Sequence, residues 1–159
     1  MNHKTKVKIY IGTDHAGFEL KEELRKYLLR SGYDVVDCGA EVYSFEDDYP
    51  DYVIPAALGA AKSNGRALAI VFGGSGIGEC IAANKVQGVR AALVYDCQTA
   101  RLSREHNNAN VLCLGGRTVT KDIKLAKRIV KVWLETSFSK HARHERRLKK
   151  IQSFERGHK

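Results

Sequence analysis

The stretch that organises the chain runs from Leu68 to Lys85 and reads Leu-Ala-Ile-Val-Phe-Gly-Gly-Ser-Gly-Ile-Gly-Glu-Cys-Ile-Ala-Ala-Asn-Lys. Its apolar start predicts a buried strand, and its second half predicts a helix. Between them, four glycines stand in the six positions 73–78. That density indicates that backbone N–H groups approach a ligand closely, or that the backbone adopts positive φ. Glu79 falls at the start of the predicted helix, where a carboxylate suits the helix dipole.

Three known glycine motifs do not fit this loop. A P-loop requires Lys and then Ser or Thr after its last glycine, but Glu79 and Cys80 stand there. The dinucleotide-binding fingerprint requires a glycine or alanine in place of Glu79. The nucleophile elbow of hydrolases requires a glycine where Ile77 stands. Two interpretations remain: an oxyanion-binding loop that carries the Ser75 hydroxyl and the Glu79 carboxylate, or a tight structural turn with a solvated Glu79.

The length of 159 residues favours a single domain, residues 1–159, with enough chain for a sizeable core. No run of about 18 apolar residues is present, so we expect no transmembrane helix and no membrane partner. Residues 1–6 lead directly into a strand pattern without an apolar secretory segment. These features predict a cytoplasmic protein.

The spacing of possible ligands does not indicate a metal site or a disulfide framework. The four cysteines are far apart and form no Cys-x-x-Cys pair, so we expect reduced thiols. The histidines lack the spacing of a metal site on one helix or hairpin. We therefore expect no metal. The residues considered are Cys38, Cys80, Cys97, Cys113, His15, His106, His141 and His144.

Positive charge is concentrated in a basic C-terminal tail, residues 140–159, which we expect to be helical. The net charge is +9, and the tail contributes +6 of it through eight basic and two acidic residues. Nucleic acid is one possible partner for such a charge. However, Leu148, Ile151 and Phe154 give the tail a short apolar stripe, which favours docking onto a protein surface. We therefore expect no nucleic-acid partner.

Strand and helix patterns alternate along the chain. Such alternation predicts an α/β fold, in which a five-stranded parallel sheet is covered by helices on both faces. In such folds ligands bind beyond the carboxyl ends of the strands. The predicted strands are 6–12, 33–37, 67–72, 89–95 and 110–114. The predicted helices are 18–29, 51–63, the part of 67–87 after the glycine loop, 99–105 and 120–136.

Polar residues that directly follow predicted strands should meet at one edge of the sheet, and their convergence favours a functional site. They are Asp14, His15, the segment 73–79, Asp96, Cys97 and the run Gly115-Gly116-Arg117. Asp14 has a structural alternative as an Asx turn and helix cap. His106 ends a predicted helix, where it acts either as a favourable cation or as a general acid.

Arg143 and Arg147 are four residues apart, so they share one face of the predicted tail helix, and His144 is adjacent. One interpretation is a solvated basic helix. The other is a binding site for a phosphate dianion, which two guanidinium groups and an imidazole suit well.

Taken together, six motifs resemble those of type B ribose-5-phosphate isomerases, a family that also includes galactose-6-phosphate and allose-6-phosphate isomerases. The resemblance covers about residues 6–156. The motifs are Gly12-Thr-Asp-His-Ala-Gly17, Asp48-Tyr-Pro50, Gly73-Gly-Ser-Gly-Ile-Gly78, Ala82-Ala-Asn-Lys85, Arg104-Glu-His-Asn-Asn-Ala-Asn110 and Arg143-His-Glu-Arg-Arg147.

The resemblance implies a Rossmann-like three-layer sandwich whose C-terminal helix docks on a partner subunit. It implies a homodimer or a dimer of dimers, with active sites shared at the subunit boundary. The implied reaction is the metal-independent, cofactor-free interconversion of ribose 5-phosphate and ribulose 5-phosphate, in the non-oxidative branch of the pentose phosphate pathway.

The resemblance also implies roles for individual residues. One branch of the family has its catalytic cysteine where Gly73 stands. The other branch resembles this chain and implies Glu79 as the base, with Ser75 stabilising the enediolate and with His106 and Asp14 opening the furanose ring. The implied substrate-binding residues are His15, Gly74, Gly76, Gly78 and Asn107. The implied phosphate-binding residues are Arg117, Arg143, His144 and Arg147, some of them from the neighbouring subunit.

Other functions stay open at this point. The substrate could be a six-carbon sugar phosphate, such as allose 6-phosphate or galactose 6-phosphate. The chain could also be a nucleotide- or nucleic-acid-binding module, or a non-catalytic subunit of a two-chain isomerase. The complete set of Asp14, Ser75, Glu79 and His106 argues against the last of these.

Overall fold

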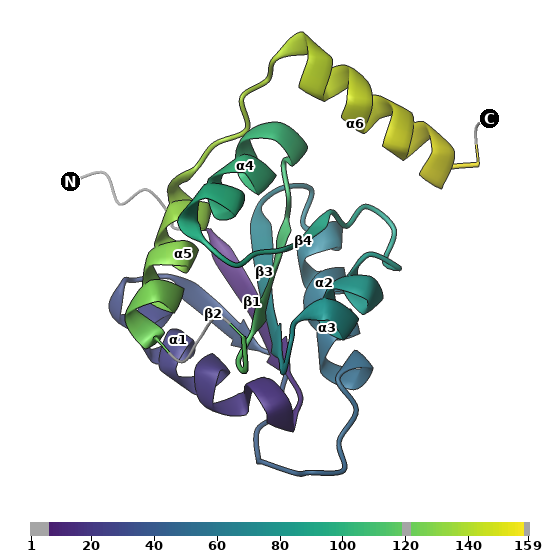
Figure 1. Cartoon of the computed structure of the whole chain (residues 1–159). Coiled ribbons are helices and arrows are strands. Elements are labelled where there is room, and N and C mark those ends of the chain that lie inside the picture. The colour runs from purple at the N-terminus through teal and green to yellow at the C-terminus, as the bar shows by residue number, and fades with distance from the viewer. Residues whose placement is uncertain (1–6, 119–121, 158–159) are drawn as a thin grey trace.

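A five-stranded parallel sheet forms the centre of the protein, with the strand order β2-β1-β3-β5-β4 (Figure 1). The computed structural model describes residues 7–118 and 122–157. Every residue of β3 is buried, as expected for a central strand covered on both faces. The predicted five-stranded parallel sheet is confirmed. The strands are β1 (Lys8–Thr13), β2 (Asp34–Asp37), β3 (Ala67–Gly73), β4 (Ala91–Leu93) and β5 (Val111–Gly115).

The helices form a layer on each side of the sheet, which confirms the predicted Rossmann-like three-layer fold. α1 (Phe18–Arg30), α4 (Cys97–Asn107) and α5 (Ile123–Glu135) pack on one face, and α2 (Pro50–Lys62) and α3 (Ile77–Ala83) pack on the other. A short 3-10 helix, η1 (His15–Gly17), leads into α1. None of the helices in the described part of the chain is long and apolar enough to cross a membrane.

Successive side chains of β3 enter different cores because a strand points them to alternate faces. Ile70 and Phe72 join the core beneath α1, α4 and α5, together with the fully buried Trp133. Ala69 and Val71 pack against α2 and α3. The strand is therefore held from both sides, and the glycine loop starts from a fixed carboxyl end.

The chain leaves β1 and β3 toward opposite faces of the sheet. These two strands are neighbours, but β1 leads to α1 on one face, whereas β3 leads to α3 on the other. Such a switch point opens a crevice at the carboxyl ends of the strands, and ligands of open α/β sheets bind there.

Several element boundaries differ from the sequence prediction. α3 ends at Ala83 because the Asn84 side chain turns the chain: its amide nitrogen donates to the carbonyl oxygen of Cys80 at 3.0 Å, and its oxygen accepts from the N–H of Ala91 at 2.9 Å. β4 consequently spans only 91–93. Residues 15–17, expected as a loop, form η1. Lys6 and Thr120, the predicted starts of a strand and a helix, lie outside the described residues.

The last helix, α6 (Ala142–Glu155), extends beyond one end of the sheet (Figure 1). A hydrogen bond connects its last residue, Glu155, to the turn before β4. The Glu155 carboxylate accepts from the N–H of Gly88 at 2.8 Å. Leu148 of the predicted apolar stripe is buried, whereas Ile151 and Phe154 are 54% and 82% exposed. Docking of this helix on a partner subunit stays a prediction, as does the single-domain organisation of residues 1–159.

Candidate active site

A cavity of about 370 Å³ opens at the carboxyl ends of β1 and β3, and we call it the Glu79 pocket. The loops after β1, β3 and β5 meet there, as the sequence predicted. Asp96 and Cys97, which follow β4, do not line it; Asp96 instead caps α4 by accepting from the N–H of Thr99 at 2.7 Å. The lining residues are Asp14, His15, Ala16, Tyr49, Gly74, Ser75, Gly78, Glu79, Arg117 and Thr118.

Asp14 is held in place by local hydrogen bonds immediately after β1. Its Oδ1 atom accepts from the N–H of Ala16 at 2.9 Å and so caps η1. The Thr13 hydroxyl donates to the carbonyl oxygens of Asp14 and Phe72, at 2.9 and 3.0 Å, which ties the turn to β3. The structural interpretation of Asp14 as a helix cap is confirmed. Its carboxylate also lines the pocket, and its functional role stays a prediction.

Gly76 allows the sharp turn from β3 into α3. Its φ is +79°, a left-handed conformation that residues with a Cβ rarely adopt. A Cβ at this position would also lie 2.7 Å from a methyl group of Leu93 and 3.0 Å from the backbone of Leu114. The neighbouring Ser75 hydroxyl accepts from the N–H of Ile77 at 3.2 Å, which caps the first turn of α3.

The Glu79 carboxylate lies against the end of β3, in space that exists only because residue 73 is glycine. A Cβ at Gly73 would lie 1.8 Å from Oε1 of Glu79 and 2.0 Å from its carboxyl carbon. Glu79 is only 4% exposed. The alternative of a structural turn with a solvated Glu79 is therefore wrong.

Burial and charge both affect the ionisation of Glu79. Burial raises the pKa of its carboxyl group, a hydrogen bond from its own backbone N–H opposes that shift, and the negative charge of Asp14 raises the pKa further. A carboxylate with a raised pKa is a stronger base near neutral pH. The pocket thus holds two carboxylates in different environments, an arrangement typical of acid–base catalysis.

Arg117 contributes a positive charge to the pocket from the loop after β5. Its N–H donates to the carbonyl oxygen of Gly74 at 2.8 Å, which joins the two loops. A Cβ at Gly74 would lie 3.3 Å from a terminal nitrogen of the Arg117 guanidinium, so this cation lies next to the glycine loop. An anionic group of a ligand can bind here.

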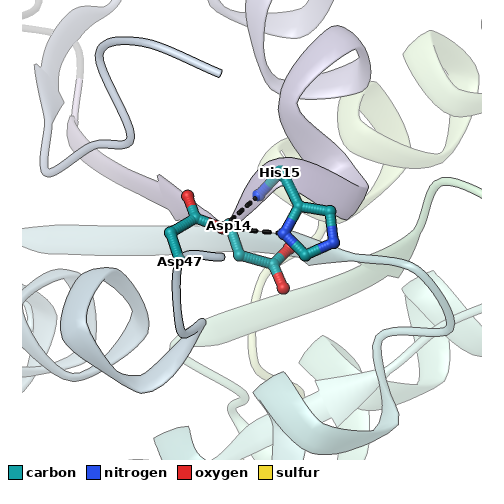
Figure 2. A group of neighbouring side chains, drawn as sticks. All are labelled: Asp14, His15 and Asp47. Carbon is teal, nitrogen blue, oxygen red and sulfur yellow. Dashed lines mark hydrogen bonds and ion pairs between the residues drawn. The ribbon is translucent and has the colours of Figure 1, made fainter. Parts of the chain in front are cut away.

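His15 is held by Asp47, a residue of the loop between β2 and α2 (Figure 2). Among the described residues, possible metal-ligand atoms of Asp14, His15 and Asp47 all lie within 4.8 Å of one another, which is close enough to hold a cation. Nδ1 of His15 already lies 2.8 Å from Oδ1 of Asp47, as a hydrogen bond requires.

Five of the predicted site residues form a second group, the His106 group, on the last turn of α4 and on α6. The imidazole rings of His106 and His144 lie 4.4 Å apart, and Nδ1 of His144 lies 2.8 Å from the Ser139 hydroxyl. Burial lowers the pKa of His144, and the neighbouring imidazole of His106 lowers it further. The members are His106, Asn107, Arg143, His144 and Arg147.

The His106 group lies at the edge of the sheet opposite to the Glu79 pocket. α4 ends just before β5 begins, and the side chain of Asn110 accepts from the N–H of Arg90, the residue before β4, at 2.7 Å. Both residues thus mark the amino ends of parallel strands. No member of the group lines the Glu79 pocket within the described part of one chain.

Comparison with known proteins identifies the family. Residues 9–151 match the model of the Ribose/Galactose Isomerase family. The chain belongs to this family. Among this isomerase's curated relatives, the ribose-5-phosphate isomerase B of Mycolicibacterium paratuberculosis is 47% identical over 152 residues, which are 96% of this chain and 94% of that protein.

Solved structures of type B isomerases have the same fold as this isomerase. The Mycoplasma genitalium ribose-5-phosphate isomerase B with bound ribulose-5-phosphate has a TM-score of 0.89 and is 41% identical, covering 94% of this chain and 96% of that one. The Clostridium thermocellum isomerase B has a TM-score of 0.87 and is 43% identical, covering 96% and 99%. The family predicted from the six motifs is confirmed.

Within this isomerase the structure brings together only part of the predicted site. Gly76 lies at the start of α3 and shapes the loop without lining the pocket. Sequence reasoning missed Asp47 and assigned no role to Tyr49, although Tyr49 belongs to one of the six motifs. The predicted residues that line the pocket are Asp14, His15, Gly74, Ser75, Gly78, Glu79 and Arg117, and the His106 group does not join them within one chain.

Proposed function

We propose that this aldose–ketose isomerase interconverts ribose 5-phosphate and ribulose 5-phosphate through a cis-enediolate, without a metal or cofactor. The observation that carries the proposal is the buried Glu79 carboxylate in a pocket at the carboxyl ends of β1 and β3. The relative from Mycoplasma genitalium, whose structure holds ribulose-5-phosphate, supports the choice of substrate. A cytoplasmic location remains a prediction from the sequence.

Glu79 is the proposed catalytic base. The reaction removes a weakly acidic proton from C2 of the open-chain aldose and returns a proton to C1, and one carboxylate on one face of the intermediate can do both. Its raised pKa suits this double role, because the group must accept a proton and then release it. General acid–base catalysis of this kind contributes roughly 100- to 10,000-fold to a rate.

The glycine loop is the proposed cradle for the oxyanion that develops on the enediolate. The Ser75 oxygen accepts its hydrogen bond from Ile77, so the hydroxyl proton of Ser75 remains available for the substrate. The backbone N–H groups of Gly74 and Gly78, which line the pocket, are further candidate donors. Each well-placed donor contributes about 2.7–4 kcal/mol to such an intermediate.

The remaining pocket residues have proposed roles in substrate binding and ring opening. Arg117 binds the phosphate as a charged donor next to the glycine loop. Asp14 transfers a proton at the anomeric hydroxyl when the furanose ring opens. His15, which also lines the pocket, contacts the substrate.

The His106 group is proposed to complete the pocket of a second copy of the chain in a homodimer. Two observations support this: the group lies away from the pocket of its own chain, and α6 exposes Ile151 and Phe154. In such a dimer, Arg143, His144 and Arg147 join Arg117 at the phosphate, and His106 assists ring opening.

A coupled assay of the purified protein tests the function. We expect turnover of ribose 5-phosphate, with allose 6-phosphate and galactose 6-phosphate assayed alongside as six-carbon alternatives. Glu79→Gln should abolish isomerisation while the binding of sugar phosphate, measured by calorimetry, survives. Near-normal turnover by this variant would refute the assignment of the base, and faster turnover of a six-carbon sugar would change the proposed substrate.

A further inference from the structure

The carboxylate of Asp47 makes two contacts with His15 (Figure 2). The Asp47 side chain is only 7% exposed, and its Oδ1 atom accepts from the backbone N–H of His15 at 2.9 Å. The same oxygen lies 2.8 Å from Nδ1 of the imidazole. An ionised carboxylate can only accept hydrogen bonds, so the proton of this contact belongs to Nδ1. The other ring nitrogen, Nε2, is left for other partners.

The loop that carries Asp47 also confines the His15 ring. The Phe45 ring lies with its centroid 5.2 Å from that of His15, and the Tyr43 ring lies at 6.1 Å in a nearly perpendicular orientation. A hydrogen bond and two ring contacts from one loop therefore fix both the position and the rotation of the imidazole.

His15 lies at the boundary between two cavities. It lines the Glu79 pocket and also an adjoining cavity of about 440 Å³, and Arg117 lines both of them. Nδ1 is engaged by Asp47, so Nε2 is the ring atom that can contact a ligand beside the Arg117 guanidinium.

We propose that Asp47 is a positioning residue, which fixes the Nδ1–H tautomer of His15 and thereby presents Nε2 to the sugar phosphate. The inference rests on the proposed function of the Glu79 pocket. Carboxylates that orient a functional histidine through its second nitrogen act in this way in metal sites and in catalytic triads. Asp47 itself lines neither of the two cavities.

Kinetics of variants provide the first test. Asp47→Ala should lower kcat/KM by roughly 10- to 100-fold, because a displaced contact group weakens substrate positioning. Most of the loss should be in KM, because His15 is a binding group. Asp47→Asn should retain much of the activity, since its amide oxygen can still accept both hydrogen bonds. Glu46→Gln makes the same change from carboxylate to amide as Asp47→Asn, at the exposed neighbouring residue. It is the matched control and should leave the kinetics unchanged.

A double-mutant cycle separates positioning from a general effect on the fold. If Asp47 acts through His15, adding Asp47→Ala to His15→Ala should change kcat/KM by less than about twofold. A further loss of about tenfold in the His15→Ala background would overturn the proposal. Thermal unfolding of each variant shows which of them are folded.

Nitrogen NMR of the imidazole provides a test that does not depend on turnover. In the wild-type protein, labelled His15 should carry its proton on Nδ1, and Asp47→Ala should populate the Nε2–H tautomer. A wild-type spectrum with an unprotonated Nδ1 would overturn the proposal even if no variant were stable. If the protein did not isomerise ribose 5-phosphate, the proposed function would fail, and the NMR result would still decide the role of Asp47.

Discussion

At Glu79, two influences favour the neutral acid, although the proposed chemistry requires the carboxylate. Burial and the charge of Asp14 both raise the pKa of this side chain. As the pH falls, Glu79 therefore becomes protonated at a higher pH than an exposed glutamate does, and it can then no longer accept a proton. The charge of Asp14 therefore contributes to the pH at which Glu79 becomes protonated.

The pH dependence of the reaction should reveal the raised pKa of Glu79. We expect kcat/KM to fall on the acid side, with an apparent pKa above the ordinary glutamate value of 4.5, as Glu79 becomes protonated. Asp14→Asn removes a negative charge near Glu79, so the acid limb should move to lower pH even though the rate itself falls. A pH–rate profile of both proteins measures this, and an unmoved limb would contradict the coupling.

The same burial should make Glu79 a source of instability. Its pKa is higher in the folded than in the unfolded protein, so the folded state binds more protons and its stability falls as the pH rises through the folded pKa. Glu79→Gln removes this penalty above that pH. The variant should thus unfold at a higher temperature than the wild type at pH 8, by roughly 2–4 °C per kcal/mol gained.

Thermal unfolding at two pH values checks this prediction. The difference between Glu79→Gln and the wild type should shrink at pH 4, where the wild-type carboxyl group is largely protonated. A variant that is less stable than the wild type at pH 8 would show that the ionised Glu79 is well compensated in its pocket.

Residues that directly follow strands could be predicted from the sequence, whereas Asp47 could not. Asp14, Ser75 and Arg117 lie at one edge because parallel strands bring their carboxyl ends together. Asp47 lies in an aromatic and acidic loop without periodicity. Its contact with His15 spans 32 positions of sequence, and no pattern of residue types indicates it.

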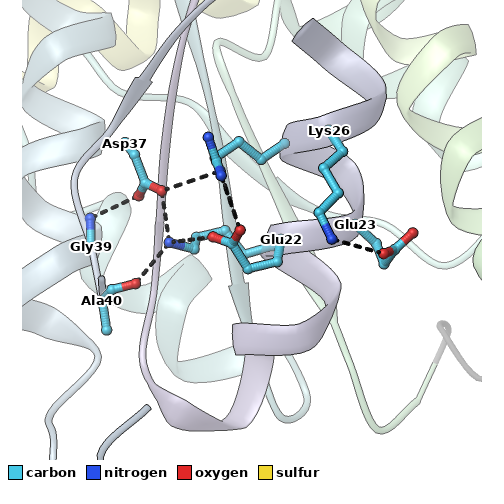
Figure 3. Close-up of polar contacts among 8 residues, drawn as sticks. Glu22, Glu23, Lys26, Asp37, Gly39 and Ala40 are labelled. Atoms are coloured by element: carbon cyan, nitrogen blue, oxygen red, sulfur yellow. Dashed lines mark hydrogen bonds and ion pairs between the residues drawn. The ribbon is translucent and has the colours of Figure 1, made fainter. Parts of the chain in front are cut away.

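A buried lysine of α1 donates hydrogen bonds to Asp37 at the end of β2 and to Ala40 in the loop that follows; both partners are labelled in Figure 3. Lys21 is fully buried, and its Nζ atom donates to Oδ2 of Asp37 at 2.8 Å and to the carbonyl oxygen of Ala40 at 2.7 Å. It also lies 3.3 Å from Oε1 of Glu22. The segment anchored in this way continues into the loop that carries Asp47.

Lys21→Met should therefore destabilise the protein and weaken the positioning of that loop. The substitution leaves the buried carbonyl oxygen of Ala40 without its donor, which typically costs about 1–3 kcal/mol. It also removes one of the cations beside the partly exposed carboxylate of Asp37. Chemical denaturation measures the loss. Lys26→Met is the matched control on the same helix, because Lys26 is exposed, its Nζ atom lies 3.5 Å from Glu23, and such surface pairs contribute about 0–1 kcal/mol. Equal effects of the two variants would contradict this account.

Element types could be predicted from the sequence more reliably than their ends. The alternation of apolar runs and amphipathic stretches indicated every strand and the order of helices between them. The early end of α3 could not be predicted, because it depends on Asn84 reaching Ala91, seven residues ahead. Such side-chain contacts are set by tertiary structure and not by local propensity.

For the whole molecule, the main feature is the separation of the predicted site into two groups. The Glu79 pocket and the His106 group occupy opposite edges of one sheet, although the sequence assigned both to one site. A single sequence carries no direct signal of which copy of a chain supplies a residue. In a symmetric dimer each copy offers both groups, so two complete sites can form from two incomplete ones.

Mixing inactive variants should restore activity if the sites are shared. Glu79→Gln lacks the proposed base, and Arg143→Ala/Arg147→Ala lacks two exposed cations of α6. After unfolding and refolding together, half of the dimers are mixed, and each mixed dimer has one intact site. We expect about one quarter of wild-type activity from such an equal mixture.

A second mixture controls for this effect. Glu79→Gln mixed with Arg117→Ala should stay inactive, because Glu79 and Arg117 line the same pocket of one chain and no mixed dimer has an intact site. Activity in both mixtures, or in neither, would contradict the shared site.

The absence of a Cβ at Gly73 limits what this position can carry. A Cβ there would lie 1.8 Å from Oε1 of Glu79, so any other residue at position 73 must displace that carboxylate from the end of β3. The resemblance of the sequence implies a second branch of the family with a cysteine at this position. A thiol at position 73 and the Glu79 carboxylate in its present place are therefore mutually exclusive, and a single substitution cannot add one to the other.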